Sequence, residues 1–122
     1  MAFERFVRIG RIYTPTASIW SRGQIGFNQG AVHKYNMADY KYAVLFYDKG
    51  TNRIGIKFSN ESSEPGAVPL TMGKTGAMVS AKAFLDYWSI RHDRTRKYPM
   101  AHDEQENLYV IQLDRPLGSA KD

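Results

Sequence analysis

The chain of 122 residues contains no cysteine. Disulfide bridges and thiolate metal sites are therefore excluded, which suits a reducing compartment. The chain also lacks any run of about 18 apolar residues, the length that a membrane-spanning helix needs. Its first residues, Met1 to Arg5, include an acid and no sustained apolar run, so they do not predict a signal peptide. These absences predict a cytoplasmic protein with no membrane contact.

Catalytic and metal-binding constellations are also missing. The histidines, His33, His92 and His102, share no metal-ligand spacing with one another or with a carboxylate. No Gly-x-Ser-x-Gly motif occurs. Residues 73–75 (Gly-Lys-Thr) match the end of a phosphate-binding loop, but Val68 stands where that loop needs glycine, so an ordinary turn is the better interpretation. The sequence therefore predicts no enzyme, no metal site and no other cofactor.

What the chain has instead is an uneven excess of positive charge. Its net charge is +5, and residues 1–60 carry nine Lys or Arg against three acids, whereas residues 61–122 carry eight against nine. A mildly basic surface often serves only solubility. Because the whole excess falls in one half, however, the sequence indicates an anionic partner.

A sequence pattern that occurs twice indicates how the chain folds. The segments 47–58 and 102–113 lie 55 positions apart. Each has an aspartate four positions before an asparagine, and apolar residues follow at alternate positions. Upstream, Asn28 and Tyr35 correspond to Ser80 and Tyr87, 52 positions later. A chain of this length holds one domain. We therefore predict an α+β, β-rich fold: a pseudo-two-fold barrel of two β-α-β-β repeats, of the swapped-hairpin or cradle-loop type.

The predicted organisation is a single domain over residues 1–122. A basic first repeat spans 16–60, a connector 61–75, an acidic second repeat 76–114 and a tail 115–122. In the first repeat, Asn28 is expected to cap a short helix over about 29–36. The continuously apolar segment 42–47 predicts a strand covered on both faces, and 53–58 predicts an alternating strand that pairs with it as a hairpin.

The second repeat is expected to follow the same plan. A brief strand over 77–79 leads to Ser80 as helix cap, and a helix over 82–89 follows. Residues 98–101 and 108–113 form the second hairpin. One stripe of this helix is expected to face the core. Its residues are Ala83, Phe84, Tyr87 and Trp88.

Two arginine-rich segments are the candidate contacts for nucleic acid, because cations that neutralise phosphates drive association by releasing counterions. The first segment is an N-terminal strand or arm with Arg5, Arg8 and Arg11. The second follows the predicted helix and holds Arg91, Arg94, Arg96 and Lys97. Trp20 and Tyr98 can stack on unpaired bases if they are exposed. The alternative is that both aromatic residues belong to the core and that the arginines only keep the surface soluble.

The first repeat resembles the AbrB (SpoVT/AbrB) family of swapped-hairpin DNA-binding domains. The similarity lies in the strand 18–27 with its glycines, the short helix 29–35 and the hairpin of 44–48 and 53–56, and it extends more weakly over 76–113. The proline that commonly opens the family's helix is replaced by Asn28. The resemblance implies that basic residues beside the first strands contact DNA, which corresponds here to Arg22.

Together, charge and resemblance predict a non-enzymatic nucleic-acid-binding protein. The leading prediction is a transcriptional regulator that binds duplex DNA, with DNA favoured over RNA. One alternative is a single-stranded nucleic-acid binder that uses Trp20. Another is a protein-interaction subunit or inhibitor whose basic face binds an acidic protein. The sequence also leaves a homodimer open.

Overall fold

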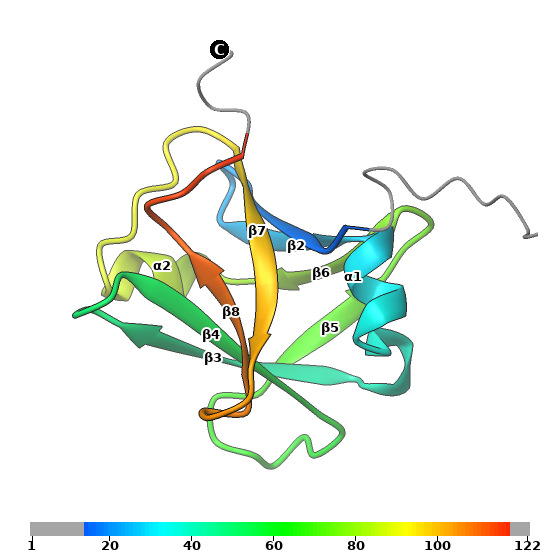
Figure 1. The fold of residues 1–122 in the computed structure, drawn as a ribbon. Helices are drawn as coiled ribbons and strands as arrows, with labels where there is room; N and C mark the ends of the chain where they lie inside the picture. The colour runs from blue at the N-terminus through cyan, green and yellow to red at the C-terminus, as the bar shows by residue number, and fades with distance from the viewer. Residues whose placement is uncertain (1–13, 118–122) are drawn as a thin grey trace, which may run out of the picture.

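The computed structural model describes residues 14–117, which form a closed antiparallel barrel of eight strands with two short α-helices (Figure 1). The predicted β-rich barrel is therefore confirmed. The strands are β1 (Thr16–Ile19), β2 (Gln24–Asn28), β3 (Tyr42–Asp48), β4 (Arg53–Ser59), β5 (Val68–Met72), β6 (Gly76–Ser80), β7 (Arg96–Asp103) and β8 (Leu108–Gln112). The helices are α1 (Gln29–Lys34), the 3₁₀ turn η2 (Met37–Asp39) and α2 (Lys82–Tyr87).

The strands follow one another around the barrel in the order β1-β2-β6-β5-β3-β4-β8-β7, and β7 pairs back onto β1. This last pair joins the start of the described chain to its final third, with Ser18 opposite Lys97 and Ile19 opposite Arg96. Closure gives each of the eight strands a neighbour on both sides, although β5 pairs only with the first two residues of β3. It also fixes which segments, distant in sequence, lie side by side on the surface.

Asn28 joins the first two strands to the first helix. Its side-chain oxygen accepts hydrogen bonds from the amides of Ala31 at 2.9 Å and Thr16 at 3.0 Å, and its amide group donates to the carbonyl of Thr14 at 2.7 Å. The first of these bonds satisfies an amide that the start of a helix leaves without a partner. The predicted helix cap is therefore confirmed, and the helix runs over 29–34.

Both predicted hairpins are present, as β3–β4 and β7–β8. Ile54, Ile56 and Phe58 are buried, as the alternation in β4 predicted. The prediction that β3 is covered on both faces holds only for the start of the strand. Val44 is 6% exposed, whereas Phe46, two residues later on the same face, is 43% exposed.

The segment between the predicted repeats contains a strand of its own. β5 lies within residues 61–75, which the sequence assigned to a connector, and it pairs with β3 and β6. Residues 73–75 form the tight connection from β5 to β6. The interpretation of Gly-Lys-Thr as an ordinary turn followed by a strand is therefore confirmed.

The start of the second helix differs from the prediction. Ala81, not Ser80, occupies the N-cap position, and no side chain caps the helix there. Ser80 is instead the last residue of β6, where it pairs with Gln24 of β2. The pairing with β2 extends the strand to the residue that the sequence assigned to the cap.

The stripe of α2 that faces the core also differs from the prediction. Leu85 is fully buried, whereas Tyr87 is 77% and Trp88 40% exposed, and Ala83 is exposed as well. Phe84 is half-buried against the core. The helix is only six residues long, so it turns one narrow face inward, and Ala81 and Leu85, four residues apart, lie on that face.

Aliphatic and aromatic side chains fill the barrel, and the two helices lie at its opposite ends (Figure 1). The pairs β2–β6 and β4–β8 bring core residues of the two halves of the chain together. The largest fully buried side chains are Ile19, Ile25, Met37, Ile54, Ile56, Val79, Leu85 and Ile111. Their burial is the main source of stability of the fold.

Leu85→Ala is expected to lower the free energy of unfolding by about 2–5 kcal/mol, because it empties a fully buried position. Tyr87→Ala, on the same helix, is expected to change it by about 0.5 kcal/mol or less, because that side chain is largely exposed. Chemical denaturation of the two variants measures the difference. Equal losses would contradict this placement of α2.

Candidate nucleic-acid interface

Barrel closure brings the turn between β1 and β2 against the segment that precedes β7. The amide of Ser21 donates to the hydroxyl oxygen of Thr95 at 3.2 Å, and a ring nitrogen of His92 lies 3.1 Å from the carbonyl oxygen of Ser21. Arg22 lies in this turn. Two predicted sites about 70 positions apart in sequence, Arg22 and the cluster 91–97, therefore meet at one end of the barrel.

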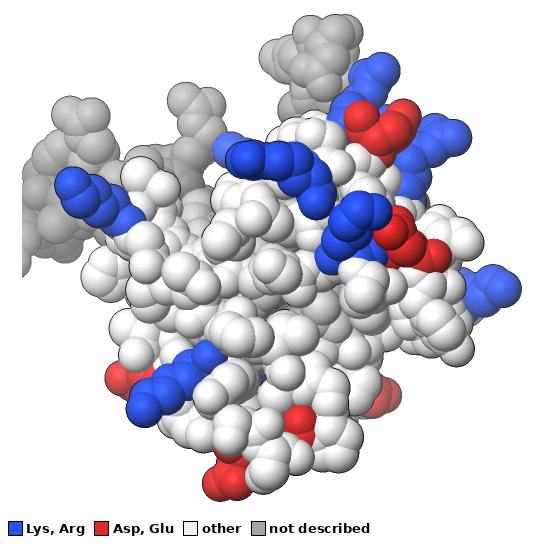
Figure 2. All heavy atoms as spheres, turned by 180° about the vertical axis from the view of Figure 1, so that it is seen from behind, with Lys and Arg blue, Asp and Glu red and all other residues white. Residues whose placement is uncertain are grey.

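Most of the cations at this end are open to solvent. Arg22, Arg91, Arg94 and Lys97 are exposed, whereas Arg96 is half-buried. Blue side chains gather over the upper part of the face in Figure 2, with some red ones among them. We call this surface the basic end; it also includes a residue that the sequence analysis missed. Its members are Arg22, Arg91, Arg94, Arg96, Lys97 and Arg115.

Arg115 was missed because the sequence assigned it to a tail. In the structure the amide of Leu117 donates to the carbonyl of Lys97 at 2.6 Å, so the chain after β8 runs back alongside the start of β7. No sequence signal pointed to this contact. Its exposed arginine consequently lies on the same end of the barrel as the cluster 91–97.

Carboxylates reduce the charge of the basic end without cancelling it. Asp93 lies 4.0 Å from Arg91, and Asp86 pairs with Lys82 at 2.8 Å. Because these pairs are exposed, water screens them and each contributes little to stability. They leave the exposed cations of the basic end available to phosphates.

The first predicted cluster, Arg5, Arg8 and Arg11, lies outside the described residues. Its role in nucleic-acid binding stays a prediction. The described chain begins at Thr14, next to β1, which pairs with β7.

The two predicted stacking residues have different environments. Tyr98 is only 4% exposed and points into the barrel, so it is a core residue, and we correct its assignment as a stacking platform. Burial raises the pKa of its hydroxyl, while the neighbouring Arg96 opposes the shift. Trp20 is half-buried on the outside of the barrel, where one face of its ring can be reached.

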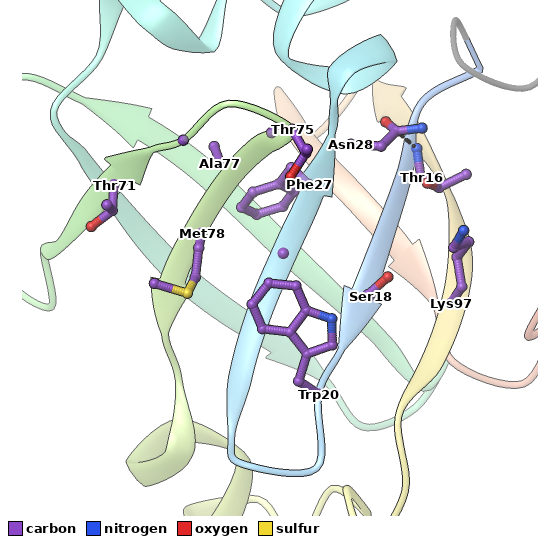
Figure 3. A pocket seen from close by; sticks show the side chains of 13 residues that line it. Thr16, Ser18, Trp20, Phe27, Asn28, Thr71, Thr75, Ala77, Met78 and Lys97 are labelled. Atoms are coloured by element: carbon purple, nitrogen blue, oxygen red, sulfur yellow. Dashed lines mark hydrogen bonds between the residues drawn. The ribbon is translucent and has the colours of Figure 1, made fainter.

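Trp20 lies in a groove on the outer face of β1, β2 and β6 with a volume of about 350 Å³. In Figure 3 the indole lies over β2, with Ser18 and Lys97 to one side and Met78 to the other. The ring lies flat because position 26 is glycine: a Cβ there would be 2.5 Å from Cζ2 of the indole. The β2 backbone therefore supports one face of the ring.

His92 holds the basic end together through both of its ring nitrogens. Nδ1 faces the carbonyl oxygen of Ser21 at 3.1 Å, and Nε2 faces a carboxylate oxygen of Asp86 at 2.9 Å. Both partners can only accept, so the arrangement needs a proton on each nitrogen, which is the imidazolium form. The hydrogen bond to Asp86, then that to Ser21, raises the pKa of His92 above 6.5. The same bond lowers the pKa of Asp86.

Exposed aromatic rings form a separate surface beside α2. The ring of Trp88 lies 5.4 Å from that of Tyr47 and 5.0 Å from that of Tyr87, measured between centroids. Tyr47 is half-buried, and Phe46, the residue before it in β3, points to the opposite face of that strand. We call Tyr47, Tyr87 and Trp88 the aromatic surface. Exposed apolar clusters of this kind are typical of contact sites for other molecules.

Within residues 14–117, no three His, Cys, Asp or Glu side chains converge in a group that could hold a metal ion. The same part of the chain has no helix with the length and apolar character needed to cross a membrane. The chemistry that the arrangement does offer is binding: cations for phosphates and a flat indole for a planar ring. Comparison of the chain with protein-family models, curated proteins and solved structures finds no match.

The His92 contact is expected to make stability depend on pH. Because the folded pKa of His92 is raised, its contribution is present below about pH 6.5 and is lost as the pH rises through the raised value. Because the folded pKa of Asp86 is lowered, its contribution is lost as the pH falls through that value.

Between the lowered pKa of Asp86 and the raised pKa of His92, urea denaturation is therefore expected to show a higher free energy of unfolding for the native protein than for His92→Gln. Above the raised pKa of His92, the two proteins are expected to have the same free energy of unfolding. Nuclear magnetic resonance gives the His92 pKa directly. Titration of His92 at or below 6.5 would contradict the contact.

Proposed function

We propose that the protein binds nucleic acid without catalysing a reaction, and that the basic end contacts the phosphates. The observation that carries the proposal is the meeting of Arg22 with Arg91, Arg94 and Lys97, which come from two distant segments and remain exposed. A site of this kind neutralises several phosphates at once and gains from counterion release. The lack of cysteine favours the cytoplasm as the compartment.

A narrower candidate is a duplex-DNA-binding transcriptional regulator built as a duplicated swapped-hairpin barrel. Exchanging β1 with β5, β2 with β6, β3 with β7 and β4 with β8 leaves the order around the barrel unchanged. At the centre of the β2–β6 pair, Gly26 is opposite Met78, 52 positions later. Gly55 is opposite Val110, 55 positions later, in β4–β8. Where two strands related by a two-fold axis pair with each other, the residue at the axis lies opposite its own counterpart in the other repeat. The separations of 52 and 55 positions equal those of the sequence repeat.

The hairpin turns support the same duplication. The Oδ1 of Asp48 accepts from the amides of residues 50 and 51, and that of Asp103 accepts from those of 105 and 106. Asn52 and Asn107 both have left-handed backbone, with φ of 56° and 54°. Each asparagine oxygen faces the residue before the aspartate, Tyr47 or His102. Duplex DNA as the target rests on this architecture together with the resemblance to AbrB domains.

A second candidate function is binding to an acidic protein, and the aromatic surface favours it. Its rings lie beside α2, next to the segment that carries Arg91. Exposed Trp and Tyr with arginine close by are common in protein interfaces. A high salt sensitivity alone would not separate this function from nucleic-acid binding. Recovery of nucleic acid with the purified protein would.

A salt-titrated binding series on duplex DNA, single-stranded DNA and RNA tests the proposal. If about four phosphates are neutralised on a duplex, log K is expected to fall with log salt with a slope of about −3 to −4. Arg94→Ala is expected to flatten the slope by about one unit at most, because it removes one phosphate contact.

Lys41→Ala is the matched control, since Lys41 is an exposed cation just before β3, at the other end of the barrel. It is expected to leave the slope unchanged. Failure of the native protein to bind any of the three nucleic acids at low salt would refute the proposal and leave an acidic protein as the leading partner.

A further inference from the structure

The groove under Trp20 has the features of a site for a planar anionic ligand. Its walls are the outer faces of β1, β2 and β6, where the outward positions hold small residues, among them Ser18, Gly26 and Gly76. Because these side chains are small, they project little from the sheet, and the indole of Trp20 is the largest flat group in the groove (Figure 3). A volume of about 350 Å³ is at the small end of the range of ligand sites, roughly 300–1,000 Å³.

The charge around the groove has one sign. Lys97 is the single charged side chain among the described residues that line it, and none of them is acidic. Two more exposed cations lie at its two ends. Arg22 is in the turn that follows Trp20, and Lys74 is in the β5–β6 connection, between the lining residues Gly73 and Thr75. A chain of phosphates that follows the groove would therefore meet a cation at each end and one at the side.

We propose that the groove binds one unpaired segment of nucleic acid, with a base stacked on the free face of Trp20 and its flanking phosphates at Lys97, Arg22 and Lys74. This inference rests on the proposed function and selects single-stranded nucleic acid as the ligand of this surface. In a duplex both faces of each internal base are already stacked on neighbours, so no face is free for an indole. Stacking on a side chain needs a base that is unpaired.

The indole depends on Gly26 for its position. A Cβ at position 26 would lie 2.5 Å from Cζ2 and 2.7 Å from Cη2 of Trp20, so Gly26→Ala has to displace the ring. The substitution is made on the outer face of β2 and leaves the core residues Ile25 and Phe27 in place. It therefore removes the stacking platform without removing the tryptophan.

The experiment compares oligothymidine with a DNA duplex of equal length. In Trp88→Phe protein, Trp20 is the remaining tryptophan, and its fluorescence is expected to be quenched by oligothymidine and not by the duplex. Trp20→Ala and Gly26→Ala are expected to weaken oligothymidine binding by about 5- to 150-fold, the range of one lost base–aromatic stack, with the salt slope unchanged. Lys97→Ala and Lys74→Ala are expected to flatten that slope by about 0.7 units each.

Trp88→Ala is the matched control, because it removes the other tryptophan, which lies outside the groove, and it is expected to leave oligothymidine binding unchanged. Trp20→Phe keeps a ring and is expected to retain most of the affinity, which separates stacking from a loss of fold. If the native protein binds nucleic acid but Trp20→Ala costs nothing, or costs duplex and oligothymidine equally, the groove is not the site and the proposed function stands. If the native protein binds neither of these nor RNA, both proposals fail.

Discussion

The pairing of β7 with β1 is the constraint on which the functional account depends. These strands lie at the start and in the final third of the described chain, and their pairing closes the barrel. Without it, Arg22 and the cluster 91–97 would belong to separate surfaces, and Lys97 would not lie beside Ser18 at the margin of the groove. The hydrogen bonds from Ser21 to Thr95 and from His92 to Ser21 extend the same contact beyond the strands.

Closure also divides the surface of the barrel into faces of different character. The outer face of β1, β2 and β6 has small residues, a flat indole and a cation. The surface near α2 carries the exposed rings of Tyr87 and Trp88. Since apolar side chains fill the interior, these outer faces are where the described residues offer binding chemistry.

Local patterns predicted the local structure well. The Asn28 cap, the inward face of β4 and both hairpins follow from short-range chemistry and are present. The prediction of which α2 residues face the core was wrong. The helix has only six residues, and the positions of the neighbouring strands determine which narrow face of it is buried. Two further features depend on which strands pair: the burial of Tyr98 and the position of Arg115 beside the start of β7. This long-range information is absent from any local pattern. The arginine cluster itself was visible, but its neighbour Arg22 was brought to it by closure alone.

The central claim is that nucleic acid binds to the joined surface of β1, β2, β7 and the segment 91–97. The most direct measurement is a map of backbone amide chemical shifts by nuclear magnetic resonance as oligothymidine is added. The account predicts that the largest changes fall on residues 18–28, 74–78 and 91–97, and on the indole N–H of Trp20. Changes concentrated on the outer face of β3, β4 and β8, around Phe46, Leu108 and Val110, would contradict it.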